Sequence, residues 1–215
     1  MKSKIQIDLA DKTLVVNLPD TFQVLSWGPF NPGQKKTRCL FNHQLDENTE
    51  INIPEIFLNL KKTLNLPENA VGLLTSAKVK NFCSHYLQSG PHWVHAIGTV
   101  GLDNTRTVGE EADVETTFDN YGTINLILAT NSLPDISGQL EALQICTMAK
   151  TRALIDMNIK SQKSRTPATG TGTDCIILAA SGEVKQNYCG MHTRLGELIG
   201  QAAYQTIKEG IEKFY

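Results

Sequence analysis

Residues 169–180 read TGTGTDCIILAA, and this stretch joins the two patterns that decide the fold. Cys175–Ala180 is a short, continuous apolar run, which is typical of a strand that is buried on both faces of a sheet. Thr169–Asp174 alternates threonine with glycine and ends in an aspartate, and glycine lets a backbone approach a ligand closely. The stretch therefore predicts a central strand that begins at a polar, glycine-rich loop.

The residues that flank this stretch predict another central strand and two long helices. Thr123–Ala129 is a second apolar run of the buried-strand type. Asp135–Met157 is predicted to be one long helix, and residues 193–213 are predicted to be the other. Ser181-Gly182 fits the two-residue turn of a hairpin, which makes Glu183–Tyr188 the expected partner strand.

The amino-terminal half is predicted to be rich in strands. Ile5–Leu9 and Leu14–Leu18 alternate apolar with polar residues, which predicts a hairpin. The other expected elements are strands at Phe22–Ser26, Arg38–Leu45, Val71–Leu74 and His92–Val100, a helix from Pro54 to about Leu64, a segment at Lys78–Gln88 that fits strand or helix, and a surface loop at Gly101–Asn120. Together they predict one α/β domain over residues 1–215, with a mixed sheet flanked by two long helices and mixed α+β as the alternative.

Composition limits the class of protein. The chain has 215 residues, of which 40% are hydrophobic and 20% charged, and a net charge of -2, all of which is ordinary for a globular protein. Its adjacent basic residues are confined to Lys35-Lys36 and Lys61-Lys62, whereas a phosphate backbone attracts clustered cations, so we expect no nucleic-acid partner. No apolar run is long enough for a signal peptide or a membrane span, and we expect no membrane partner.

The cysteines indicate a reducing compartment. There are five, an odd number, and none forms a C-x-x-C pair, which favours free thiols over a disulfide framework. We therefore expect a cytoplasmic protein. The sequence is compatible with a homo-oligomer and does not specify one.

The threonine–glycine loop is the leading candidate for a functional site. Its backbone N–H groups suit an anion or oxyanion, and Thr171 or Thr173 could act as a nucleophile if a base lies nearby. The hairpin register would place Thr171 opposite His192, so that His192, a hydroxyl and Asp174 could form a base, nucleophile and orienting group. The alternatives are a simple polar turn before a strand, and a His192 that serves only the end of the last helix.

A cation interrupts an apolar row of the first long helix. Lys150 lies in line with Cys146 and Leu154 at helical spacing. A buried charge is costly unless it is paired or used, so Lys150 is a second site candidate, and the alternative is that its ammonium reaches solvent at the helix edge. Thr75, Thr99, Asn104 and Asn125 follow or precede strand ends, and they suggest a polar rim, although each alone is more typical of a structural role.

No metal site is predicted. His92 and His95 are three residues apart, which in a strand sends the two side chains to opposite faces. Cys83 and His85 could share a face, but two ligands do not make a site. No cofactor is predicted, and the sequence leaves a metal requirement open.

Several short motifs occur along the chain in one consistent order. They are Leu25-Ser26 with Asn31 and Gly33, Asn42, Gly72-Leu73-Leu74-Thr75, Gly101 with Asn104, Gly122-Thr123-Ile124-Asn125, Ala149-Lys150, Ala168–Asp174, Gly190-x-His192 and Leu195-Gly196-Glu197. These motifs resemble those of the adenosylcobinamide amidohydrolase family of corrinoid-salvage enzymes, and the resemblance covers roughly Leu25 to Tyr204. Pro32 stands in place of a family glycine, and Val100 stands where alanine is usual, which could alter substrate preference.

The resemblance implies hydrolysis of the amide that joins a propionate of the corrin ring to its aminopropanol arm, with adenosylcobyric acid as the product that re-enters cobalamin synthesis. The corrinoid would be the small-molecule substrate. The substrate-binding candidates among the matched positions are Ser26, Asn31, Gly33, Asn42, Thr75, Gly101, Asn104, Asn125, Thr169, Gly170, Gly172 and Glu197.

The catalytic hypothesis assigns His192 as general base and acid, Asp174 as its orienting or charging partner, and Thr171, Thr173 or a water that they hold as the attacking group. The N–H groups of Gly170–Thr173, with Asn125 or Lys150, would stabilise the oxyanion. Two rival functions remain open: a corrinoid-binding or carrier protein without turnover, and a self-processing hydrolase that cleaves before an internal threonine such as Thr171.

Overall fold

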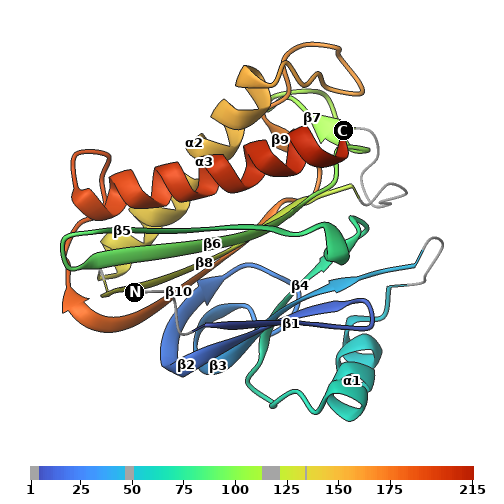
Figure 1. The fold of residues 1–215 in the computed structure, drawn as a ribbon. Coiled ribbons are helices and arrows are strands. Elements are labelled where there is room, and N and C mark those ends of the chain that lie inside the picture. Colours follow the sequence, from blue (N-terminus) through green and yellow to red (C-terminus); the bar gives the residue numbers. More distant parts are fainter. Residues whose placement is uncertain (1–4, 47–50, 113–121, 134) are drawn as a thin grey trace.

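One mixed sheet organises the computed structural model, which describes residues 5–46, 51–112, 122–133 and 135–215 (Figure 1). The strands lie in the order β4-β3-β2-β10-β8-β6-β5, and β1 pairs with β2. Their bounds are β1 Gln6–Ala10, β2 Thr13–Ser26, β3 Gly33–Gln44, β4 Val71–Thr75, β5 Cys83–Ser89, β6 His92–Val100, β8 Ile124–Leu133 and β10 Cys175–Lys185. A separate two-stranded sheet joins β7, Thr105–Arg106, to β9, Gly170–Thr171.

The central unit is β8, helix α2 and β10. Strands β8 and β10 are parallel, with Asn125 level with Cys175, so both begin at the same edge of the sheet. Helix α2, Ile136–Asp156, makes the crossover between them, and the Asp135 side chain caps it by accepting from the Gly138 N–H at 2.9 Å. This edge is the one at which the threonine–glycine loop enters β10.

Helices α2 and α3 cover the same face of the sheet (Figure 1). Helix α3, Arg194–Phe214, begins at Thr193, whose hydroxyl accepts from the Gly196 N–H at 2.9 Å. The apolar sides of both helices pack on β6, β8 and β10 to form the largest buried cluster. None of the helices in the described part of the chain is both long and apolar enough to cross a lipid bilayer.

The sheet curls, so that β1 to β4 lie under the other face of β6, β8 and β10 (Figure 1). A second core cluster fills the space between the two halves. Asn125 on β8 donates to the Leu74 carbonyl on β4 at 2.7 Å, although these strands are not neighbours in the sheet. Helix α1, Ile53–Leu64, packs outside β3 and β4 on a third cluster.

Most of the expected elements are confirmed, as is the fold class of a mixed sheet with two long helices. The segment that fitted strand or helix is a 3-10 turn, Val79–Asn81, followed by strand β5. The expected surface loop at Gly101–Asn120 contains the short strand β7 in its described portion, and its residues 113–120 lie outside the described residues.

The hairpin expected at Ser181-Gly182 is wrong. Strand β10 continues to Lys185 and stays parallel to β8, with a register shift between Ala180 and Val184. Gly182 has a φ of +81°, which a bulge accommodates as readily as a hairpin turn does. Because the strand does not reverse, the segment after Lys185 lies at the far end of the sheet from the threonine–glycine loop.

Candidate functional site

The threonine–glycine loop is held at the sheet edge where β8 and β10 begin. Its Gly170 and Thr171 form β9 and pair with Arg106 and Thr105 of β7. The Thr169 N–H donates to the Arg106 carbonyl at 2.9 Å, which extends the pairing by one more hydrogen bond. The loop is therefore fixed by strand pairing with β7, and it places Asp174 beside the first residue of β8.

The Asp174 carboxylate collects donors from three parts of the chain. One oxygen, Oδ2, accepts from the Lys150 ammonium and from the Thr171 N–H at 2.9 Å. The other, Oδ1, accepts from the Ile124 N–H at 2.9 Å and from the Thr171 hydroxyl. A carboxylate offers about four lone-pair positions, so these four donors occupy its capacity. Asp174 thereby ties together α2, β8 and its own loop.

Lys150 is buried and paired, and it does not reach freely into solvent. Its side chain is 9% exposed and that of Asp174 is 10% exposed. Both residues nevertheless line the same open cleft, described below. The expectation that this cation is paired within the apolar row is confirmed, and the alternative of a solvent-directed ammonium is wrong.

Two glycines of the loop are required by close packing. A Cβ atom at Gly170 would lie 2.6 Å from Asp174 Oδ2 and 2.9 Å from Lys150 Nζ. A Cβ atom at Gly172 would lie 2.5 Å from Asn104 Nδ2, and the Gly172 N–H donates to the Asn104 carbonyl at 3.1 Å. Neither glycine has a positive φ. Their role in the structure is therefore to admit the protein's own side chains, whereas the approach to a ligand that the sequence suggested stays a prediction.

A cleft of about 760 Å³ opens over the loop. Its lining residues are Trp27, Arg106, Thr107, Val108, Thr147, Lys150, Thr151, Thr169, Gly170, Thr171, Gly172, Thr173, Asp174 and Cys175. The cleft thus combines the Lys150–Asp174 pair with three threonines of the loop and a wall from helix α2. This is a mixture of polar chemistry and apolar surface typical of small-molecule sites.

Seven of the cleft residues were not predicted as site residues from the sequence: Trp27, Arg106, Thr107, Val108, Thr147, Thr151 and Cys175. The Trp27 indole N–H donates to the Asp174 carbonyl at 3.1 Å, and the side chain is 49% exposed at the rim. Thr147 and Thr151 flank Lys150 on helix α2, and the Thr151 hydroxyl donates to the Thr169 carbonyl at 2.9 Å. Thr147 lies three residues before Lys150 and four before Thr151, and this helical spacing is the signal that could have identified it. Nothing local to Arg106 predicts its place, because the β7–β9 pairing brings it there.

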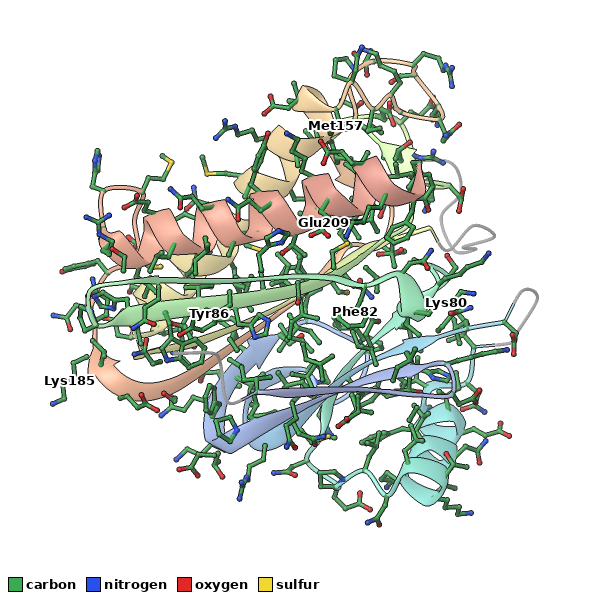
Figure 2. The ribbon with its side chains drawn as sticks, in the orientation of Figure 1. Lys80, Phe82, Tyr86, Met157, Lys185 and Glu209 are labelled. Carbon is green, nitrogen blue, oxygen red and sulfur yellow. The ribbon has the colours of Figure 1, made fainter. Side chains whose placement is uncertain are left out.

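The fifth predicted catalytic residue, His192, does not join this site, and the expectation that it lies beside Thr171 is wrong. Strand β10 runs eleven residues away from Asp174 before the chain reaches His192. At about 3.3 Å per residue, those eleven residues place the end of β10 roughly 36 Å from Asp174. Figure 1 shows β9 beside the carboxyl-terminal end of α3, whereas His192 comes just before the other end of this helix. In Figure 2, Lys185 marks the end of β10 at the edge of the molecule near the start of α3. His192 is exposed.

Glu197 is likewise distant from the cleft. It lies in the first turn of α3, five residues beyond His192, and pairs with Arg194 at 2.5 Å. A carboxylate in the first turn of a helix interacts favourably with the positive end of the helix dipole, which accounts for its position. The structure gives it no contact with the loop.

The predicted polar rim is an internal network. Asn125 donates to Asn42 at 3.0 Å and to the Leu74 carbonyl, while Asn42 donates to the Thr99 hydroxyl at 2.9 Å. These side chains are buried and hydrogen-bonded within the protein. They tie β3, β4, β6 and β8 together beneath the site edge, and the expected role of Asn125 as an oxyanion donor is not supported by this geometry.

The remaining binding candidates also have structural partners. Ser26 donates to the Ile176 carbonyl at 3.0 Å, and the Thr75 hydroxyl accepts from the Ala77 N–H at 2.9 Å. Asn31 and Gly33 have φ values of +52° and +83°, and they shape the turn between β2 and β3. The Gly101 N–H donates to the Thr123 carbonyl at 2.9 Å. Of the twelve proposed binding positions, Thr169, Gly170 and Gly172 line the cleft, and Asn104 supports it from below.

Cys175 lines the cleft but is poorly suited as a nucleophile. Burial raises the pKa of its thiol to about 11, and the negative charge of Asp174 acts in the same direction while Lys150 opposes it. At neutral pH the group is therefore a thiol, which is far less reactive than a thiolate. The polar side chains that line the cleft are the Lys150 ammonium, the Asp174 carboxylate, the Arg106 guanidinium and several threonine hydroxyls. Within the described residues, no three His, Cys, Asp or Glu side chains are grouped as metal ligands.

This chain matches known proteins over most or all of its length. A relative from Methanocaldococcus jannaschii, an uncharacterized protein, is 29% identical over 227 residues, which cover 94% of this chain and 86% of the relative. The family model described as adenosylcobinamide amidohydrolase matches residues 1–215, the whole chain. The chain therefore belongs to the adenosylcobinamide amidohydrolase family.

Proposed function

We propose that this chain hydrolyses adenosylcobinamide at the amide between the aminopropanol arm and the corrin-ring propionate, releasing aminopropanol and adenosylcobyric acid in cobalamin salvage. Membership of the family supports this reaction. The single observation that carries it is the buried Lys150–Asp174 pair, which lies in the cleft with the Thr171 hydroxyl on the same carboxylate. Amide hydrolysis needs a nucleophile, a group that stabilises the oxyanion and a proton for the leaving amine.

Lys150 is assigned to the oxyanion and the leaving amine. Its ammonium is held at a defined position by Asp174, and it lines the cleft where a substrate carbonyl would bind. The N–H groups of Thr171 and Gly172 are engaged by Asp174 and by the Asn104 carbonyl, so they are not the main oxyanion donors. A preorganised cation in a partly buried site is worth more than the same cation in water.

Thr171 is assigned as the nucleophile. Its hydroxyl donates to Asp174 Oδ1, so the proton can pass to that carboxylate as Oγ1 forms a bond to the substrate carbonyl carbon. The C–N bond then breaks, aminopropanol leaves with a proton from Lys150, and the acyl group stays on Thr171 as an ester. Attack by water on this ester releases adenosylcobyric acid and restores the threonine. The Thr173 hydroxyl makes no hydrogen bond to the part of the chain that the structure describes, and it is available to hold that water.

The test is aminopropanol release from adenosylcobinamide by the purified chain, with and without a chelator. Thr171→Val should abolish release because valine keeps the shape and lacks the hydroxyl, whereas Thr171→Ser should retain part of the activity. Thr173→Val should slow ester hydrolysis, which would allow an acylated chain to be detected by intact mass. Corrinoid binding without any release by the native chain would refute the proposal and favour the carrier function. A native chain found cleaved before Thr171 would favour self-processing.

A further inference from the structure

An apolar groove on helix α2 adjoins the cleft. It has a volume of about 370 Å³ and is lined by Thr147, Met148, Thr151, Arg152, Ile155 and Asp156. Thr147 and Thr151 line both hollows, so they form the ridge that the two share. A molecule whose reacting group lies beside Lys150 can therefore extend over this ridge into the groove.

The groove exposes apolar side chains that the fold does not use. Met148 is 43% exposed and Ile155 is 50% exposed, and they lie seven residues apart on one face of α2. The charged residues at the groove already have partners, because Arg152 pairs with Asp156 at 3.4 Å and lies 4.7 Å above the Tyr204 ring. What the groove offers a ligand is chiefly the apolar surface of Met148 and Ile155.

We infer that this groove binds the edge of the corrin macrocycle, and that Met148 and Ile155 determine specificity for it. The inference rests on the proposed function. The scissile amide lies on a side arm, whereas most of a corrinoid is a broad ring that carries many methyl groups. Clefts of 300–1,000 Å³ accommodate drug-sized ligands, and a corrinoid is substantially larger, so a cleft of about 760 Å³ cannot enclose the ring and the arm together. The groove is the apolar surface that continues from it.

Leu140 supplies a matched control on the same helix. It is 57% exposed and lies on the same exposed side of α2 as Met148, eight residues earlier, but it lines neither hollow. A macrocycle in the groove would contact Met148 and Ile155 and leave Leu140 bare. A second copy of this chain packed along α2 would bury all three side chains.

The experiment compares the double variant Met148→Gln with Ile155→Gln against Leu140→Gln. Glutamine keeps the helix propensity and removes the apolar contact, and exposed substitutions of this kind leave stability nearly unchanged. Binding is measured by equilibrium dialysis with adenosylcobyric acid, which retains the macrocycle and lacks the scissile amide. The double variant should bind roughly tenfold more weakly than the native chain, and Leu140→Gln should bind equally well. With adenosylcobinamide, the double variant should show a raised KM and an unchanged kcat.

Three outcomes would overturn the inference: equal affinity of the double variant and the native chain, equal weakening in Leu140→Gln, or no binding of adenosylcobyric acid by the native chain. A change of mass in sedimentation on substitution of any of the three would assign the surface to a second copy instead. An absence of aminopropanol release would contradict the proposed function. It would not affect the dialysis measurement, because adenosylcobyric acid is not hydrolysed and its binding can be measured without turnover.

Discussion

Replacing Lys150 by methionine separates catalysis from folding at the site. Methionine has nearly the length of lysine and keeps the contacts of the stem along the apolar row, but it removes the ammonium. Asp174 then retains three donors: the Ile124 N–H, the Thr171 N–H and the Thr171 hydroxyl. The change therefore removes one charge from a buried pair and leaves the carboxylate hydrogen-bonded.

These contacts set limits on how much free energy of unfolding the Lys150→Met variant loses. Removing one partner of a buried ion pair costs about 3–5 kcal/mol, and the three remaining donors place this case at the lower end. For a chain of this length, a loss of 1 kcal/mol lowers Tm by about 2–4 °C, so Lys150→Met should melt roughly 6–12 °C below the native chain. Domains have free energies of unfolding of about 5–15 kcal/mol, so the variant should still fold.

Turnover should fall much further than the loss of stability alone would cause. Loss of one oxyanion donor lowers the rate by about 100- to 1000-fold, so aminopropanol release by the folded variant should fall at least that far. Lys150→Arg keeps the charge but cannot give up a proton at accessible pH, and it should restore part of the stability without restoring turnover. Lys208→Met is the matched control, because Lys208 pairs with Glu212 at the surface of α3, and it should alter neither quantity. Near-native release by a folded Lys150→Met would refute the assignment of Lys150.

Three further predictions follow from the same geometry. Gly170→Ala should lower both Tm and turnover, because the new Cβ would lie 2.6 Å from Asp174 Oδ2. Gly190→Ala is the control and should change neither Tm nor turnover, because no atom lies within 4 Å of its Cβ. Equal effects of the two substitutions would contradict the packing argument. His192→Ala should leave aminopropanol release unchanged because the imidazole is exposed at the far end of β10, and a loss of tenfold or more would show that the distance estimate misleads. Burial raises the pKa of the Cys175 thiol from 9.0 to about 11, so the folded state binds this proton more tightly than the unfolded state does. The free energy of unfolding should therefore decline as the pH rises between these two values. Urea titrations across this range should show a shallower decline for Cys175→Ser.

The local features of the site could be read from the sequence. The threonine–glycine alternation before an apolar run predicted a polar, glycine-rich loop at the start of a central strand, and Lys150 was identified by its position in an apolar helical row. Gly170 and Gly172 were expected to let a ligand approach the backbone, and in the structure they make room for side chains of the protein itself. Each of these inferences depends on neighbours within a few residues or one helical turn, which is the range over which sequence patterns carry physical information.

The strand register could not be read in the same way. Gly182 can adopt the positive φ that a hairpin turn needs and the positive φ that a bulge needs, so the two residues alone favour neither structure. The choice depends on whether the residues after Gly182 can pair with β8, which they do at Ser132 and Leu133. The wrongly predicted hairpin turn placed His192 beside the threonine–glycine loop, whereas it lies at the opposite end of β10.

The sequence by itself determined the composition class, the family resemblance, most helices and strands, and the residues of the loop. Only the tertiary structure decided that Lys150, Ile124 and Thr171 all donate to Asp174, and that His192 does not take part. Lys150 and Ile124 lie 24 and 50 residues from Asp174 along the chain. Contacts over such separations follow from how the whole sheet buries its two faces, and no short segment contains that information.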